Sequence, residues 1–298
     1  MGKIDWEKRT LGRTGFEVTV LCIGGAWLGN LRGSYDDQVG IDTVLAGLEA
    51  GINLIDTSDN YIDGRSEGIV GRALEEWWSR GNRREDLILS SKVSVHEDNP
   101  EAFTYEGTMR SFENSLRELR TDYLDMFLVH DPTELSLVLA DDGSIGALRK
   151  LKEQGSIRAI GLGCRPHELH RRCIETGEFD VSLTFQDYSL LGTTAEAGVL
   201  EPAGRHDVGV MNASINYSLG VPADADRYQR LERWCLEHEV DVATLNLHFS
   251  LREKRFASTL IGFSRPARVE QNLAAYAATV DDAVWDDLQS DLGVPVEG

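Results

Sequence analysis

Basic residues, long apolar runs and targeting features are scarce in this sequence. Its 298 residues include 30 Lys and Arg against 50 Asp and Glu, which gives a formal net charge of -20 at pH 7. A field of that sign repels phosphate backbones and anionic lipids, which argues against nucleic-acid and membrane partners. No apolar run reaches the roughly 18 residues of a membrane-spanning helix, and the first residues lack the apolar core of a signal peptide. We therefore expect a cytoplasmic protein.

Cysteine is also rare, with four residues, Cys22, Cys164, Cys173 and Cys235. They form no CxxC pair and show no spacing typical of metal ligands. Three of them fall in apolar or helical segments, where a cysteine usually behaves as a small buried side chain. The sequence therefore predicts reduced thiols and no metal site.

A glycine-rich phosphate loop and an interdomain linker are missing too. The first strand-like segment runs into GGAWLG, which lacks the GxGxxG spacing of a doubly wound nucleotide-binding fold. No Pro/Gly/Ser-rich stretch or change in composition divides the chain. A doubly wound sheet is therefore only the second choice of architecture, and we expect residues 1–298 to form a single domain.

Strand-like and helix-like segments alternate along the whole chain. Each apolar run typical of a buried strand precedes a segment whose apolar residues have helical spacing. The expected strands cover residues 18–25, 53–58, 87–93, 124–131, 157–164, 181–189, 208–215 and 258–263. The helices are expected at 36–51, 66–80, 104–120, 143–155, 166–177, near 193–206, twice within 226–253, and at 266–277. Eight such units predict a closed (β/α)8 TIM barrel of the α/β class.

Two further segments lie outside this repeat. Residues 9–18 contain Gly12 and Gly15, which suit the turn of an N-terminal β-hairpin across the floor of the barrel. Residues 281–293 follow the eighth unit. We expect them to form an extra C-terminal helix on the outside of the barrel.

Polar residues stand at the ends of neighbouring strands, where the active site of a (β/α)8 barrel lies. Asp56 ends the second strand and Tyr61 follows in its loop, while Lys92 and His130 end the third and fourth strands. Taken singly, Asp56 suits a cap for the next helix, and His130 suits a hydrogen-bonded packing residue. Lys92 is less ordinary, because an ammonium that closes an apolar strand needs water or a partner.

Together these four residues can polarise a carbonyl group. A nearby ammonium lowers the pKa of a tyrosine by stabilising the phenolate, and an aspartate paired with the lysine holds that ammonium in place. The phenol then exchanges a proton with the carbonyl oxygen, which a histidine can orient. The set therefore suits a reaction in which a hydride arrives from elsewhere.

The same segments resemble the aldo-keto reductase family over almost the full chain. LGRTGFEVTVLCIGG is similar to that family's N-terminal hairpin and first strand, and INLIDTSDNYIDGRSEGIVGRAL to its signature around the catalytic Asp and Tyr. LILSSKV and DMFLVHDP occupy the places of its Lys and His strands. The resemblance assigns Tyr61 as the general acid/base and His130 as the substrate-orienting group. It makes Asp56 and Lys92 the pair that tunes the tyrosine.

The resemblance also implies a nicotinamide cofactor, NAD or NADP, stretched across the barrel mouth. TLIGFSRPARVEQNL looks like the family's nucleotide segment, and such a loop-to-helix start offers free N–H groups to phosphate. Considered apart from the barrel, the same segment would be interpreted as an ordinary helix start with solvated arginines. Gln186 matches the residue that binds the nicotinamide carboxamide, and Gln271 and Asn272 fall where the family reads adenine. The expected cofactor contacts are Gly25, Trp27, Asp56, Cys164, Arg165, Gln186, Ser214, Gly262, Ser264, Arg265, Arg268, Gln271 and Asn272.

Two departures from the family pattern affect the nicotinamide end of that site. Gly163 and Cys164 stand where the family commonly has a Ser-Asn pair, so two carboxamide contacts are missing unless Arg165 or backbone groups replace them. Ala213 replaces the aromatic residue that stacks on the nicotinamide. Both changes resemble the aldose 1-dehydrogenase branch, such as the L-galactose and L-fucose dehydrogenases, which oxidise the anomeric carbon of a free sugar.

A third departure concerns the choice between NAD and NADP. Gly262 stands where many NADPH-preferring members carry a lysine, whereas Arg268 remains to meet a 2′-phosphate. The net charge of -20 also disfavours the more anionic cofactor. We therefore expect a slight preference for NAD.

The leading hypothesis is an NAD(P)-dependent oxidoreductase that acts on an aldehyde or a sugar hemiacetal. Asn212, Asn216 and Tyr217 are polar enough to suit a sugar. A barrel lyase with Lys92 as Schiff-base nucleophile would leave Tyr61 without a role. A further alternative is an NADPH-binding regulatory subunit with little turnover, resembling the potassium-channel β subunits. The replacement of the usual Ser-Asn pair at the end of the fifth strand keeps this alternative under consideration.

Overall fold

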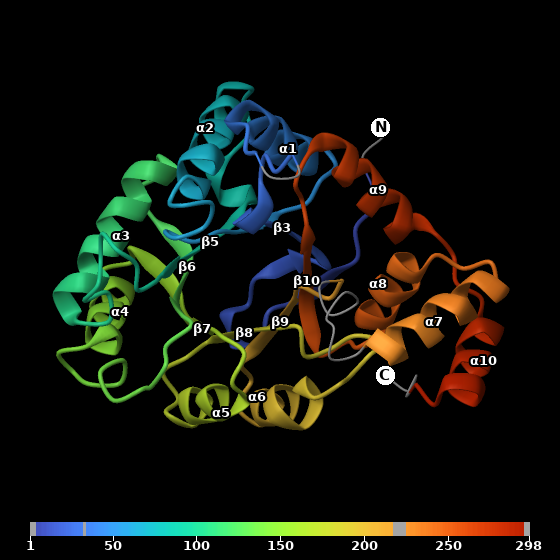
Figure 1. Ribbon diagram of the computed structural model, residues 1–298. Coiled ribbons are helices and arrows are strands. Elements are labelled where there is room, and N and C mark those ends of the chain that lie inside the picture. The colour runs from blue at the N-terminus through green and yellow to red at the C-terminus, as the bar shows by residue number, and fades with distance from the viewer. Residues whose placement is uncertain (1–3, 32–33, 217–224, 295–298) are drawn as a thin grey trace.

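The computed structural model describes residues 4–31, 34–216 and 225–294. Eight parallel strands close into a barrel in the order β10-β3-β4-β5-β6-β7-β8-β9. Figure 1 shows the helices as a ring around this barrel. The (β/α)8 barrel expected from the alternation of segments is therefore confirmed.

The elements follow the expected repeat closely. The strands are β1 (Lys8–Thr10), β2 (Glu17–Thr19), β3 (Leu21–Gly24), β4 (Leu54–Asp56), β5 (Ile88–Val93), β6 (Leu124–His130), β7 (Ile157–Gly163), β8 (Val181–Phe185), β9 (Gly209–Ala213) and β10 (Phe256–Gly262). The α-helices are α1 (Asp37–Glu49), α2 (Ser66–Ser79), α3 (Tyr105–Leu119), α4 (Ser144–Glu153), α5 (His167–Glu175), α6 (Glu201–Arg205), α7 (Ala225–Glu237), α8 (Val242–Arg252), α9 (Pro266–Ala277) and α10 (Asp282–Leu292). A π-helical turn, Glu196–Leu200, leads into α6. The strand expected at 181–189 ends early, because Gln186 adopts a left-handed backbone with φ of 62°.

An N-terminal hairpin closes the floor of the barrel. β1 and β2 pair antiparallel, and Leu11, Phe16 and Val18 pack against the side chains of the barrel interior. The start of the first expected strand was therefore wrong. Residues 18–19 belong to the hairpin, and the barrel strand begins at Leu21.

Arg9 of the hairpin binds the segment that connects α8 to β10. Its guanidinium donates to the carbonyl oxygens of Leu251 at 2.6 Å, Glu253 at 3.2 Å and Phe256 at 2.7 Å. These carbonyls lie at the end of α8 and the start of β10, and β10 pairs with β3 to close the barrel. The hairpin thus stabilises the seam of the barrel as well as its floor.

The extra C-terminal helix, α10, lies on the outside beside α7 and α8 (Figure 1). Its Trp285 and Leu288 are buried against apolar residues of those helices. This placement agrees with the expectation from sequence. Among the residues described, every helix falls short of the length and hydropathy needed to traverse a bilayer.

Strand alternation directs the polar strand ends into the barrel mouth. Along β6, Met126 and Leu128 fill the interior, and His130 continues the same face because side chains alternate with a period of two. Lys92 is the register partner of Leu128, and Asp56 ends β4 on the face of the interior residue Leu54. The upper layer of the barrel is therefore polar on the side of β4, β5 and β6, above an apolar filling.

Gly71 lets α2, which follows the Tyr61 loop, approach α3 closely. A Cβ built at Gly71 would lie 2.0 Å from the carbonyl oxygen of Glu118. Gly68 stands one turn earlier on the same helix, and its Cβ would meet only the flexible carboxylate of Glu118, at 3.3 Å. The two glycines therefore differ in what they contribute to packing.

Gly71→Ala should lower the free energy of unfolding by about 1–3 kcal/mol, because the added methyl group forces the helix backbones apart. Gly68→Ala should be neutral or stabilise by up to about 1 kcal/mol, because alanine is the better helix former. Urea-induced unfolding of the two variants and the wild type measures both effects. Equal effects at the two positions would contradict the close contact at Gly71.

Candidate active site

The ammonium of Lys92 is buried beneath the barrel mouth and paired with Asp56. Its Nζ donates to Oδ2 of Asp56 at 2.5 Å and to the carbonyl oxygen of Thr57 at 2.7 Å. The hydroxyl of Ser90 donates to the other carboxylate oxygen of Asp56 at 2.8 Å. Burial opposes the charge on Lys92, but the carboxylate of Asp56 outweighs it and holds the pKa of the lysine above its ordinary value. Lys92 therefore stays an ammonium.

Tyr61 lies over this pair, in the loop between β4 and α2. Nζ of Lys92 is 4.6 Å from the centroid of its ring. Ile62 and Asp63 have left-handed φ values of 56° and 52° and reverse the chain before α2 begins. Burial raises the pKa of the Tyr61 phenol, and Lys92 lowers it by less, so the pKa stands above its ordinary value. The net lowering expected from the sequence was wrong, because desolvation outweighs the ammonium.

His130 faces Tyr61 across the mouth, with ring centroids 5.4 Å apart and an interplanar angle of 82°. Its Nδ1 lies 2.8 Å from Oγ of Ser94 and 3.2 Å from Oγ of Ser58. Burial, helped by the charge of Lys92, lowers the pKa of His130 to about 3, so the ring is neutral at pH 7. A serine hydroxyl that donates to Nδ1 leaves the ring proton on Nε2, ready to be donated to a substrate oxygen.

Asp59 connects this serine pair to helix α3. Its Oδ2 accepts from Oγ of Ser111 at 2.7 Å and from the backbone N–H of Ser94 at 3.2 Å. The hydroxyls of Ser58 and Ser94 are 3.0 Å apart. The sequence interpretation missed this support for His130, because Ser58 and Asp59 look like ordinary turn residues. Only Ser94 could have been suspected from the sequence, because it follows Lys92 by two residues and so continues the same face just beyond β5.

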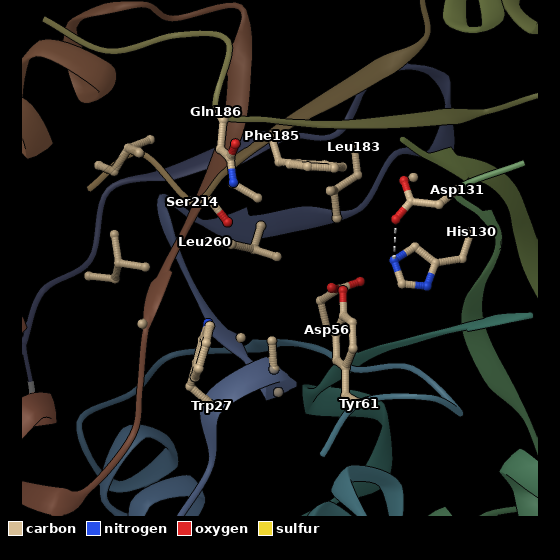
Figure 2. A pocket seen from close by; sticks show the side chains of 18 of the residues that line it. Trp27, Asp56, Tyr61, His130, Asp131, Leu183, Phe185, Gln186, Ser214 and Leu260 are labelled. Carbon is tan, nitrogen blue, oxygen red and sulfur yellow. Dashed lines mark ion pairs between the residues drawn. The ribbon is translucent and has the colours of Figure 1, made fainter. Parts of the chain in front are cut away.

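Asp56, Tyr61 and His130 line a cavity of about 570 Å³ at the barrel mouth (Figure 2), with Lys92 buried beneath it. Of the residues expected at the site, the lining includes Gly25, Trp27, Asp56, Tyr61, His130, Gln186, Ser214 and Gly262. The sequence interpretation missed Asn60, Ile62, Asp131, Leu183, Phe185 and Ile215, which also line it. Asp131 and Phe185 directly adjoin expected residues at strand ends, and this adjacency was the available signal.

A second cavity, of about 310 Å³, shares Trp27, Asn216 and Gly262 with the first. The remaining lining comes from Asn30, Ser264, Arg265, Arg268 and Asn272. Both arginines stand at the start of α9, and neither forms an ion pair with a carboxylate of the described residues. Free guanidinium groups beside a helix N-terminus suit phosphate groups. The two adjoining cavities therefore fit an elongated dinucleotide whose one end reaches the Tyr61 side.

Three expected cofactor contacts lie outside both cavities. Cys164 follows the inward-facing Gly163, so its buried side chain faces the outside of the barrel, where Sγ lies 3.9 Å from the carbonyl oxygen of Pro166. Arg165 is held by Asp187, with Nε 3.2 Å from Oδ1. Gln271 is exposed on α9 and contributes to neither lining. These expectations therefore find no support in the geometry.

Of the residues expected to face a sugar, one turns away from the cavities and one lines them. Asn212 lies between two inward-facing residues of β9, so its amide turns outward and donates to the carbonyl oxygen of Tyr188 at 3.2 Å and to Oγ of Ser250 at 2.8 Å. That expectation was wrong for Asn212. Asn216 lines both cavities, and Tyr217 lies outside the described residues.

All the cysteine thiols are buried and free of disulfide bonds. This agrees with the expectation of small buried side chains. Within residues 4–31, 34–216 and 225–294, no group of three or more His, Cys, Asp or Glu side chains is arranged to hold a metal ion.

Comparisons with known proteins agree with this geometry. The chain is 29% identical to the pyridoxal 4-dehydrogenase of Microbacterium luteolum, over 96% of this chain and 97% of that protein. It is 29% identical to the L-galactose dehydrogenase of Arabidopsis thaliana, over 90% and 88% of the two chains. The solved structure of an aldo-keto reductase from Bacillus halodurans, in its holo form, matches with a TM-score of 0.78 and 26% identity over 96% of each chain.

The similarity to the family covers all eight strands of the barrel. The sequence model of the Aldo/keto reductase family matches residues 20–291, which include every strand of the barrel and all four polar residues at its mouth. The chain therefore belongs to the aldo/keto reductase family.

Proposed function

We propose that the protein is an NAD(P)-dependent oxidoreductase that transfers a hydride between a nicotinamide cofactor and an aldehyde or sugar hemiacetal. The observation that carries the proposal is the buried pair of Lys92 and Asp56 beneath Tyr61, with neutral His130 across the mouth. Two similar proteins are by name dehydrogenases of pyridoxal and of L-galactose. Those names support the substrate class, and the cavity is large enough for either kind of molecule.

Tyr61 serves as the general acid/base in this proposal. The phenol is protonated at pH 7, because burial raises its pKa above an ordinary value that is already well above 7, and a donor to a carbonyl oxygen must be protonated. Lys92 limits the rise in the pKa of the phenol and stabilises the phenolate left after the proton has moved. In the oxidative direction the phenolate takes the proton of the substrate hydroxyl. Asp56 acts through Lys92, because it holds the ammonium in position.

His130 positions the substrate oxygen. Its Nδ1 accepts a hydrogen bond from the hydroxyl of Ser94 at 2.8 Å, so Nε2 carries the ring proton and remains as the donor toward the cavity. The pKa of His130 is far below 7, so the protonated imidazolium is not populated at pH 7. His130 therefore orients the carbonyl oxygen by a hydrogen bond and leaves the proton transfer to Tyr61. The two side chains therefore have separate tasks on the same oxygen.

When bound, a nicotinamide dinucleotide supplies or accepts the hydride. Gln186 and Ser214 line the cavity on the side opposite Tyr61 (Figure 2), and both offer hydrogen bonds to a carboxamide. Arg265 and Arg268 are suited to hold phosphate groups through charge-assisted hydrogen bonds. Gly262 lines both cavities and leaves open space, because a Cβ there would have no atom within 4 Å.

Two other functions compete with this one. A Schiff-base lyase needs an uncharged lysine amine, whereas Asp56 keeps Lys92 protonated. An NADPH-binding regulatory subunit would bind the cofactor tightly and turn over poorly. A panel of free aldoses and simple aldehydes, assayed with NAD(H) and NADP(H) in both directions, separates these functions. Tight cofactor binding with negligible turnover on the whole panel would overturn the proposal.

Tyr61→Phe should lower turnover by at least about a hundredfold, because it removes the general acid/base, and should leave the dissociation constant of the cofactor nearly unchanged. Steady-state kinetics and cofactor titration measure the two quantities. Tyr123→Phe is the matched control, because that ring packs against Arg84 before the start of β6. Retention of more than about a third of the activity by Tyr61→Phe would contradict the role of Tyr61.

Lys92→Met should lower turnover at least as much and move the alkaline limb of the residual pH–rate profile to higher pH. The sign follows from the charge, since Lys92 lowers the pKa of Tyr61 and its removal lets that pKa rise. The profile is measured under single-turnover conditions, where chemistry limits the rate. An alkaline limb that does not move would show that Lys92 does not tune Tyr61.

Arg268→Ala should weaken binding of NADP(H) much more than binding of NAD(H), and the wild type should modestly prefer NAD(H). A charge-assisted hydrogen bond to the 2′-phosphate is worth about 1.5–3 kcal/mol, but position 262 offers no second cation. The measurement is the dissociation constant of each cofactor for the wild type and for Arg268→Ala, at fixed ionic strength. Arg233→Ala, on the exposed side of α7, controls for the change in net charge. Equal losses for the two cofactors, or a wild-type preference for NADPH above about tenfold, would contradict this prediction.

A further inference from the structure

Asp131 brings an uncompensated carboxylate to the substrate end of the cavity. It directly follows His130, lines the cavity, and has a side chain that is 55% exposed. Its Oδ2 lies 3.6 Å from Nε2 of His130, and Figure 2 shows the two side chains side by side at the cavity wall. His130 is neutral at pH 7, so it does not neutralise this charge. No described residue donates a hydrogen bond to the carboxylate at a normal distance.

The backbone holds Asp131 in an unusual conformation. Its φ is 45°, in the left-handed region that few residues other than Gly, Asn and Asp adopt. The backbone N–H donates to the carbonyl oxygen of Gly163 at 2.8 Å, which fixes the residue at the end of β6. Backbone strain of this kind concentrates at functional sites. The hydrogen bond and the left-handed backbone together place the carboxylate at the cavity wall.

Asn60 supplies the complementary group on the same cavity. Its Oδ1 accepts a hydrogen bond from Oγ of Ser58 at 3.0 Å. The NH₂ group of Asn60 then remains without an acceptor among the described residues. The lining of the cavity therefore includes an acceptor, the carboxylate of Asp131, and a donor, the NH₂ group of Asn60. A substrate with several hydroxyl groups can pair with both, because each hydroxyl donates and accepts, whereas an ammonium group can only donate.

Resting on the proposed function, we infer that Asp131 is a specificity-determining residue. It selects substrates that carry a hydroxyl group on the carbon next to the reacting carbon, as α-hydroxy aldehydes and aldoses do. The oxygen of the reacting carbon accepts from Nε2 of His130, and the neighbouring hydroxyl donates to Oδ2 of Asp131, 3.6 Å from that nitrogen. A site built to bind a hydroxyl rejects the analogue that lacks it, because its polar groups are then left without partners.

The test compares the reduction of glycolaldehyde with that of propanal, which replaces the hydroxyl by a methyl group of similar size. The variants are Asp131→Asn, which removes the charge, and Asp131→Gly, which removes the side chain. Both residue types tolerate the left-handed backbone. The ratio of the two kcat/KM values is measured for each protein. Hydration of the aldehydes affects every protein equally and cancels when the ratios are compared.

The glycolaldehyde-to-propanal ratio should fall by about 10- to 100-fold from the wild type to Asp131→Gly, the range expected for one hydrogen bond to a charged group. Asp131→Asn should give an intermediate ratio. Glu134→Gln removes an exposed charge of the same loop and should keep the wild-type ratio. Thermal unfolding of each variant verifies that it is folded.

A failure of the role of Asp131 and a failure of the proposed function give different results. Turnover of both aldehydes with the same ratio in the wild type, Asp131→Asn and Asp131→Gly would overturn the role of Asp131 and leave the proposed function intact. A ratio that falls equally in Glu134→Gln would also overturn it, since a general effect of charge would then explain the preference. Absence of turnover on every aldehyde and aldose would overturn the proposed function, and the role of Asp131 with it.

Discussion

The ion pair between Lys92 and Asp56 is the constraint on which the barrel mouth depends. Lys92 is 0% exposed and Asp56 is 1% exposed, and an unpaired charge so placed would cost several kcal/mol. The pair forms because β4 ends on Asp56 opposite Ser90 of β5, and Lys92 follows Ser90 by two residues on the same strand face. Ser90 and the carbonyl oxygen of Thr57 complete the hydrogen bonds. Tyr61 lies directly over this buried charge, and the charge adds to the burial that keeps His130 neutral.

Much of this arrangement follows from the sequence by elementary rules. The alternation of apolar runs and helical segments predicts the barrel, and strand ends that carry Asp, Lys and His in neighbouring units predict a common site. Errors arose where a single residue step decides which way a side chain faces. Cys164 and Asn212 each follow an inward-facing residue and therefore turn outward. The pattern of residue types does not locate a strand to within one residue, so it could not show which way these two side chains face.

Burial explains the other difference between expectation and structure. From the sequence, Lys92 alone acts on the pKa of Tyr61, and the direction of the shift is down. In the folded barrel, desolvation raises that pKa by more than the ammonium lowers it, and the same desolvation lowers the pKa of His130. Desolvation depends on the surrounding packing, which a list of residue types does not contain. Asp131 was missed for a different reason, because only the folded cavity shows that its carboxylate lacks a partner.

The contacts of Arg9 have a consequence for synthesis of the chain on the ribosome. Its acceptor carbonyls lie 242, 244 and 247 residues further along the sequence. The hairpin therefore emerges long before its partners exist, and β3 waits equally long for β10. Until then the nascent chain has two open sheet edges, which are prone to pair with other chains. The barrel can therefore close only after β10 has been synthesised, and the hairpin can be fixed to the seam only at the same late stage.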